Sequence, residues 1–232
     1  MFAIWWLEAV VGLALAGLGP PPTQQTEIRL PAPQRDGKVS LERCLATRRS
    51  VRAFRDAPLG LAEVSQLLWA AQGITGGDRL RTAPSAGALY PLEVYLVAGR
   101  VEGLEAGIYK YRPERHALVR RRSGDHRRSL AGAALGQESL AEAPVTVLLA
   151  GVVARTAKRY GDRAERYMHM EAGHAGQNIC LQAVALGLGS VPIGAFRDGQ
   201  LKRAAALEDE EAPLYLFPVG RPRSAARSVP RR

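Results

Sequence analysis

The stretch TRRSVRAFRD, residues 47–56, places four arginines where the preceding helical pattern should continue its apolar face. Leu41, Cys44 and Leu45 recur at helical spacing and predict that face on a short helix. Arg48 occupies the next position of that face. Either this arginine faces the interior and needs an anionic partner, or the helix ends and the arginines are solvated. The residues alone leave both interpretations open.

The composition of the 232-residue chain is that of a folded globular protein. It is 47% hydrophobic and 23% charged, and its length suits one domain with a large core. The net charge of +10 is unevenly placed, because five arginines fall within residues 221–232. The sequence has no RNA- or DNA-binding motif, so no nucleic-acid partner is predicted. Cys44 and Cys180 lie far apart in apolar helical patterns and indicate neither a disulfide framework nor a zinc site.

The first residues of the chain are almost entirely apolar and stand apart from the rest. They approach the ~20 residues of a spanning helix, but they lack the cationic start of a secretory signal. A signal or membrane anchor, a misassigned start and a peripheral helix remain open, as do a cytoplasmic and an exported or anchored location. We divide the chain into a signal-like or anchor segment (1–19), a linker (20–37), a folded domain (38–220) and a basic tail (221–232).

Hydrophobic spacing predicts an α+β order of elements in the folded domain. The run 144–153 is apolar throughout, which is typical of a central buried strand. The segment 164–189 is a long helix, apolar around much of its circumference, so we expect it to be buried in the core or at a subunit interface. Further helices are predicted at 61–74 and 198–207, and further strands at 92–99, 107–111, 116–120 and 213–220.

Several common site motifs do not occur in the sequence. It has no P-loop, and GLGSVPIG (187–194) follows a helix rather than a strand, so it is no dinucleotide-binding turn. His169 and His174 are five residues apart and do not share a helix face, so no metal site is predicted with Glu171. Ser85 lacks a nucleophile elbow, and a hydrolase is not predicted.

Three separated segments together resemble the FMN-dependent nitroreductase superfamily. They are TRRSVRAF (47–54), RTAPSAGALYPLEVYLV (81–97) and EAGHAGQNICLQAVALGLGSVPIGAF (171–196). The likeness runs from about residue 41 to 220 and is strongest to the SagB/ThcOx-type dehydrogenase branch. It implies a nitroreductase-like fold, in which an antiparallel central sheet is flanked by helices. It also implies a domain-entwined homodimer with FMN at the subunit interface.

The resemblance assigns residues to FMN, whose anionic phosphate suits the planar donor fork of arginine. Arg48 and Ser50 match the family positions that hold the phosphate, while Arg52 matches a cationic position near the ribityl and pyrimidine end of FMN. Small residues at 84–88 let the backbone approach the flavin, although many relatives have Asn in place of Ala88. The implied FMN-binding residues are Arg48, Arg49, Ser50, Arg52, Pro84, Ser85, Ala86, Gly87, Ala88, Pro192, Ile193, Gly194, Ala195, Arg221 and Arg223.

The resemblance also implies catalytic roles for Arg159 and Tyr160. The azoline oxidases of the branch carry an adjacent Lys-Tyr pair, and here Tyr160 matches the tyrosine while Arg159 replaces the lysine. Arginine keeps its proton at workable pH, so it orients groups or stabilises charge but does not act as a base. A purely structural Tyr160 remains open.

Three functions are compatible with these features. The first is a flavin-dependent oxidoreductase with ping-pong hydride transfer from NAD(P)H through FMN to a nitroaromatic, quinone or similar acceptor. The second is oxidation of a peptide heterocycle or small molecule with oxygen as acceptor. The third is a non-catalytic flavin-binding protein. We favour the first, because Arg159 counts against azoline oxidation.

Overall fold

A seven-stranded sheet forms the centre of the computed structural model, which describes residues 27–77 and 79–223. Its strand order is β1-β4-β3-β2-β5-β7-β6, and every neighbouring pair is antiparallel, as predicted. The strands are β1 (Glu27–Arg29), β2 (Leu92–Ala98), β3 (Gly107–Arg112), β4 (Ala117–Ser123), β5 (Val145–Gly151), β6 (Gly189–Ser190) and β7 (Ala212–Gly220). The helices are α1 (Leu41–Thr47), α2 (Leu61–Gln72), α3 (Arg127–Ala133), α4 (Glu138–Glu142), α5 (Val153–Tyr160), α6 (Ala164–Ala185) and α7 (Asp198–Ala204), with short 3-10 turns η1 (Ala86–Ala88) and η2 (Gly161–Arg163).

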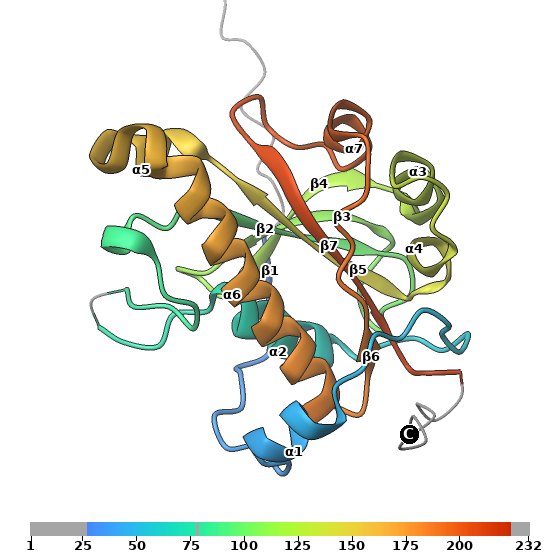
Figure 1. Cartoon of the computed structure of the whole chain (residues 1–232). Coiled ribbons are helices and arrows are strands. Elements are labelled where there is room, and N and C mark those ends of the chain that lie inside the picture. The colour runs from blue at the N-terminus through green and yellow to red at the C-terminus, as the bar shows by residue number, and fades with distance from the viewer. Residues whose placement is uncertain (1–26, 78, 224–232) are drawn as a thin grey trace, which may run out of the picture.

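Helices cover both faces of the sheet (Figure 1). On one face α2 and α6 pack through Leu67 and Ile179 against strand residues such as Leu96. On the other face α3, α4 and α7 bury a second apolar cluster, to which Leu130 and Leu201 belong. Strand β5 lies between these layers and is buried along its whole length, which confirms the predicted central strand.

The N-terminal part of the folded domain begins earlier than the sequence predicted. Residues 27–37 were expected in a linker, but β1 pairs with β4, and Leu30 is buried. The hydroxyl of Ser65 on α2 donates to Pro31 O at 2.6 Å, and Gln34 N–H donates to Gln66 Oε1 at 2.9 Å. The linker prediction is therefore wrong from residue 27 onward, because a strand this short shows no readable periodicity.

The prediction for residues 1–19 lies outside the described part of the chain. No helix within residues 27–77 and 79–223 is both long and apolar enough to cross a bilayer.

The long predicted helix is α6, and one of its faces is open. It contacts α2, α5 and β7, and a Cβ atom placed on Gly176 would lie only 2.5 Å from the ring of Phe217. Glycine therefore lets the helix approach the sheet closely. The opposite face is exposed, so the expected burial on several sides is confirmed only in part. That face carries Arg166, His169, Met170, Gly173, His174 and Gln177.

Candidate functional site

The Arg48 loop begins where α1 ends. Arg48 caps the helix, with its backbone N–H donating to Cys44 O at 2.9 Å. Cys44 is buried, but Leu41 and Leu45 are 59% and 53% exposed. The prediction of one buried face is therefore wrong for the two leucines. Helical spacing defines a face but does not tell which element covers it.

A close approach of two segments holds this loop in place. Val51 N–H donates to Ser190 O at 3.0 Å, and Ser50 forms a parallel bridge with Ser190. A Cβ atom on Gly189 would lie 2.7 Å from the Val51 side chain. Glycine at that position lets residues 50–51 lie directly beside β6.

Three arginines of this loop have no carboxylate partner in the part of the chain that the structure describes. Arg48 is half-buried, whereas Arg49 and Arg52 are exposed. Among the described residues, no carboxylate lies within 4.0 Å of their guanidinium groups, and Arg49 donates only to the carbonyl oxygens of Ala46 and Arg48. Burial raises the pKa of the Cys180 thiol to about 11, and the nearby charge of Arg48 opposes that rise. The loop thus presents a concentration of positive charge beside α6 that fits a phosphate group.

The segment 192–195 continues from β6 past this loop. Ile193 exchanges two backbone hydrogen bonds with Leu216, at 2.8 and 3.0 Å. Gly194 and Ala195 are exposed, and Gln137 Nε2 donates to Ala195 O at 3.0 Å. Within the described chain, neither the Gly194 nor the Ala195 backbone N–H donates a hydrogen bond. Both are available to a polar ligand edge.

The C-terminal arginines lie next to the Arg48 loop but have carboxylate partners. Arg221 pairs with Glu63 at 3.1 Å, and Arg223 pairs with Glu142 at 3.0 Å. Arg223 N–H also donates to Ala53 O at 3.0 Å. Their role in binding phosphate stays a prediction. We call residues 48–52, 192–195, Arg221 and Arg223 the phosphate-side group.

A second group forms around η1. Gly87 and Ala88 have positive φ angles of 61° and 53°, and Tyr90 has one of 47°. A Cβ atom on Gly87 would lie 3.0 Å from Tyr160 Oη and 3.1 Å from Arg159 Nη1. The structure therefore brings the small-residue segment 84–88 together with the predicted catalytic pair at the end of α5. We call these residues the tyrosine-side group.

Sequence reasoning missed two residues that support the tyrosine-side group. Tyr167 packs edge-on against the Tyr160 ring, with ring centroids 5.0 Å apart. Glu171 is buried, and its Oε1 accepts from Ala86 N–H at 2.9 Å. Burial raises the pKa of Glu171, while the hydrogen bonds from Ala86 and Ser85 oppose the rise. The sequence signal that could have identified Glu171 was a carboxylate among the buried positions of α6.

The two groups lie at opposite ends of α6. Figure 1 shows α5 beside the first turns of this helix and α1 and β6 beside its last. Glu171 marks the tyrosine-side end, and Ala185 precedes the turn into β6. At 1.5 Å per residue this separation is about 20 Å along the helix. A single chain therefore does not bring the two groups into one site.

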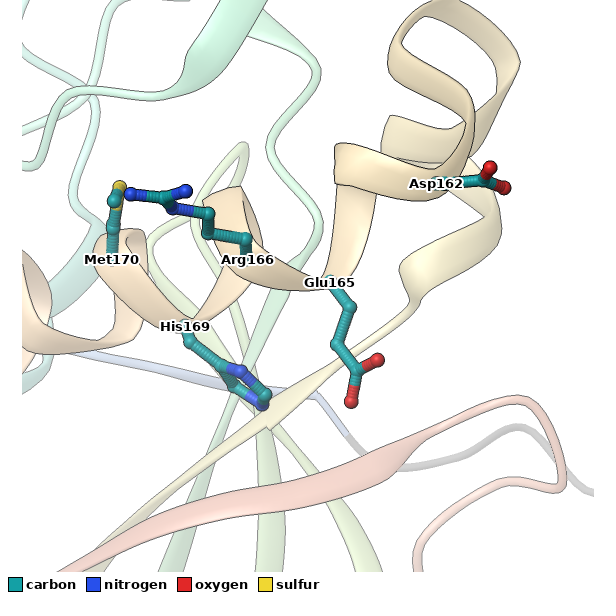
Figure 2. A pocket seen from close by; sticks show the side chains of 5 residues that line it. All are labelled: Asp162, Glu165, Arg166, His169 and Met170. Atoms are coloured by element: carbon teal, nitrogen blue, oxygen red, sulfur yellow. The ribbon is translucent and has the colours of Figure 1, made fainter.

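The open face of α6 is hollowed near the tyrosine-side group. Figure 2 shows Arg166 beside Met170, with His169 and Glu165 projecting from the same helix. The hollow has a volume of about 610 Å³ and is also lined by Asp162. Glu171 does not line the hollow: it is buried, and its carboxylate accepts a hydrogen bond from Ala86 N–H. The hollow is open to any partner that covers this face.

Comparisons with known proteins agree with the fold. The model of the nitroreductase family matches residues 45–221. A protein of Methanocaldococcus jannaschii, provisionally named a nitroreductase, is 47% identical over 195 residues, which cover 84% of this chain and 96% of that protein. A crystal structure from Anabaena variabilis, also provisionally a nitroreductase, is 33% identical with a TM-score of 0.77. The match covers 92% of this chain but only 45% of the Anabaena chain.

A structure of the Escherichia coli microcin synthetase complex with a truncated pro-microcin bound contains a further similar chain. It is 26% identical with a TM-score of 0.68, and the match covers 76% of this chain and 70% of that one. Fold, motif order and sequence identity lead to the same assignment: the chain belongs to the nitroreductase family.

Proposed function

We propose that this flavin-dependent oxidoreductase binds FMN and passes hydride from NAD(P)H to a nitroaromatic, quinone or similar acceptor. The observation that carries the proposal is the phosphate-side group, where Arg48, Arg49 and Arg52 have no carboxylate partner among the described residues. The exposed residues Gly194 and Ala195 belong to the same group, and their backbone N–H groups donate no hydrogen bond within the described chain. These donors suit a ligand with a phosphate at one end and polar ring atoms at the other.

We further propose that two chains form each site. The phosphate-side and tyrosine-side groups are separated by about 20 Å along α6. A two-fold axis crossing the middle of α6 would pair this helix antiparallel with its partner and bring opposite ends together. The open face fits this arrangement, because Gly173 lies near its centre and a Cβ atom there would meet nothing within 4 Å. Exposed Leu41 and Leu45 would gain a cover from the partner.

FMN supplies the hydride chemistry when it is bound, accepting from NAD(P)H and donating to the acceptor. Arg48, Arg49 and Ser50 would bind its phosphate, and Arg52 would add positive charge to the same site. The Gly194 and Ala195 N–H groups would donate hydrogen bonds to polar atoms of the flavin. Tyr160 donates a proton to the acceptor, and Arg159, which cannot act as a base, stabilises developing negative charge.

A second candidate is oxidation of a peptide heterocycle or small molecule. The similarity to a chain of the microcin synthetase complex supports it, because that structure holds a pro-peptide. Arg159 disfavours it, because the guanidinium cannot take up a proton from a substrate. A non-catalytic flavin-binding protein is the remaining alternative.

The test combines spectroscopy with transient kinetics. We expect the purified protein to be yellow, with about one FMN per chain, and to be reduced by NADH or NADPH in stopped flow. Tyr160→Phe should slow reoxidation by the acceptor by ~10²–10⁴-fold, the usual range for a general acid, and change reduction far less. A colourless protein that FMN cannot reconstitute would refute the proposal. If neither NADH nor NADPH reduces the flavin, the remaining functions are the second candidate and flavin binding without catalysis. If Tyr160→Phe changes the rate of neither half-reaction, Tyr160 is a structural residue.

Light scattering tests the two-chain site. We expect a dimer that does not dissociate on dilution without losing flavin. A monodisperse monomer that retains FMN would refute the shared site while leaving the chemistry intact.

A further inference from the structure

The tyrosine-side group contains a backbone that L-amino acids rarely adopt. Gly87, Ala88 and Tyr90 have φ angles of 61°, 53° and 47°. Glycine accepts such angles freely, but alanine and tyrosine do not. Residues in this region persist when their surroundings hold them there. Residues 85–90 therefore need a contact that holds them in this conformation.

One buried carboxylate holds this segment against α6. Glu171 is only 4% exposed, and its Oε1 accepts from Ala86 N–H at 2.9 Å. The Ser85 hydroxyl oxygen accepts from Tyr90 N–H at 2.9 Å. The strained residues are thus held at one end by the bond between Glu171 and Ala86, and the bond between Ser85 and Tyr90 closes the same segment.

The far side of the segment faces the catalytic pair. The position of Gly87 limits where the Tyr160 hydroxyl and Arg159 Nη1 lie, at 3.0 and 3.1 Å from a Cβ atom placed on Gly87. Tyr167 limits the Tyr160 ring from another side. A shift of the segment would therefore open space beside the Tyr160 hydroxyl.

We infer that Glu171 is a positioning residue for Tyr160: it holds residues 85–90 in their strained conformation, and that conformation fixes the site of the Tyr160 hydroxyl. The inference rests on the proposed function, in which Tyr160 transfers a proton. It assigns Glu171 no contact with the substrate. The residue acts through the backbone of Ala86.

Three variants and a matched control test the inference. Glu171→Ala removes the hydrogen bond to Ala86, whereas Glu171→Gln keeps an acceptor oxygen for it. Ser85→Ala removes the hydrogen bond that Tyr90 N–H donates to the Ser85 hydroxyl, without changing α6. Glu165→Gln is the control, because Glu165 is an exposed carboxylate six residues earlier on the same helix. Circular dichroism and flavin content check that each variant folds.

The first measurement is hydrogen exchange of the peptide covering residues 84–91, which needs no turnover. Glu171→Ala should speed exchange by about 10- to 100-fold, as expected for the loss of a hydrogen bond to a charged group, and Glu171→Gln should be intermediate. Ser85→Ala should loosen the same peptide. Exchange in Glu165→Gln should match the wild type. Unchanged exchange in Glu171→Ala and Ser85→Ala would overturn the inference, whatever the enzyme's activity.

The second measurement is a double-mutant cycle that combines Glu171→Ala with Tyr160→Phe. A merely structural role of Glu171 would not produce coupling between the two changes. Glu171→Ala should slow reoxidation by the acceptor about 10- to 100-fold in the wild-type background. In the Tyr160→Phe background the same change should have little effect, because coupled residues are not additive. Equal factors in both backgrounds would overturn the inference. If Tyr160→Phe itself has no effect, the proposed role of Tyr160 fails, while the exchange result still decides whether Glu171 holds the segment.

Discussion

Replacing Gly87 with alanine combines a backbone cost with a displacement in the candidate site. At a φ of 61°, alanine pays about 1–2 kcal/mol for the left-handed conformation. Alanine also reduces the conformational freedom of the unfolded chain, which offsets about 0.4–1 kcal/mol of this cost. The variant should therefore lose about 1 kcal/mol of unfolding free energy. The new Cβ atom would lie 3.0 Å from Tyr160 Oη and 3.1 Å from Arg159 Nη1. Because both are the ends of side chains, they should move rather than block folding.

Gly103→Ala provides the matched control. Gly103 has a φ of 76°, but a Cβ atom there would meet nothing within 4 Å. Both variants should lower the Tm by about 2–4 °C, the usual shift for about 1 kcal/mol in a chain of this size. Only Gly87→Ala should slow reoxidation of the reduced flavin, by ~10-fold or more, because small misplacements of reacting groups are costly. Equal reoxidation rates in the two variants would refute the placement of Tyr160 at the reacting atoms.

Three further predictions concern cofactor binding, pH and packing. Arg48→Ala should raise the Kd for FMN by about 10- to 100-fold in a titration of apoprotein, because it removes a charge-assisted contact. Burial lowers the pKa of His116, so as pH falls this histidine is protonated in the unfolded chain before it is protonated in the folded protein. Denaturation midpoints should therefore fall as pH drops below about 6.5, and His116→Gln should remove that part of the dependence. Gly176→Ala should lower the unfolding free energy by about 1–3 kcal/mol in a thermal melt, because the new Cβ atom would lie 2.5 Å from the Phe217 ring. Gly132→Ala on α3 is the control: a Cβ atom there would lie within 4 Å of nothing, so the unfolding free energy should not fall.

The sheet was predictable where hydrophobic runs are long. Strands β2 and β5 and helix α2 were predicted within about two residues, because each buries a continuous apolar face. Strand β1 was missed, since three residues give no periodicity and their partner β4 lies far along the chain. The faces of α1 were misjudged, because Leu41 and Leu45 look like core residues whether or not a neighbour covers them.

The candidate site was predictable as segments but not as contacts. The motif around Arg48 and the small residues at 84–88 stand out in the sequence. Their separation along α6 does not, because it depends on where α1, β6 and α5 pack. Glu171 was considered only as a metal ligand, and its bond to Ala86 joins residues 85 positions apart. Contacts of that kind follow from tertiary packing and leave no local pattern.

The position of the two groups beside opposite ends of one helix links FMN binding to assembly. Because α6 is a single rigid element, it keeps the phosphate-side and tyrosine-side groups apart in each chain. Under the proposed two-chain site, FMN contacts both chains at once. Thermodynamic linkage then requires that FMN strengthens the dimer by the same factor by which dimerisation strengthens FMN binding. Loss of Arg48 should accordingly weaken the dimer in the presence of FMN and leave the apoprotein dimer unchanged, which separates a ligand-linked interface from one that merely lies nearby.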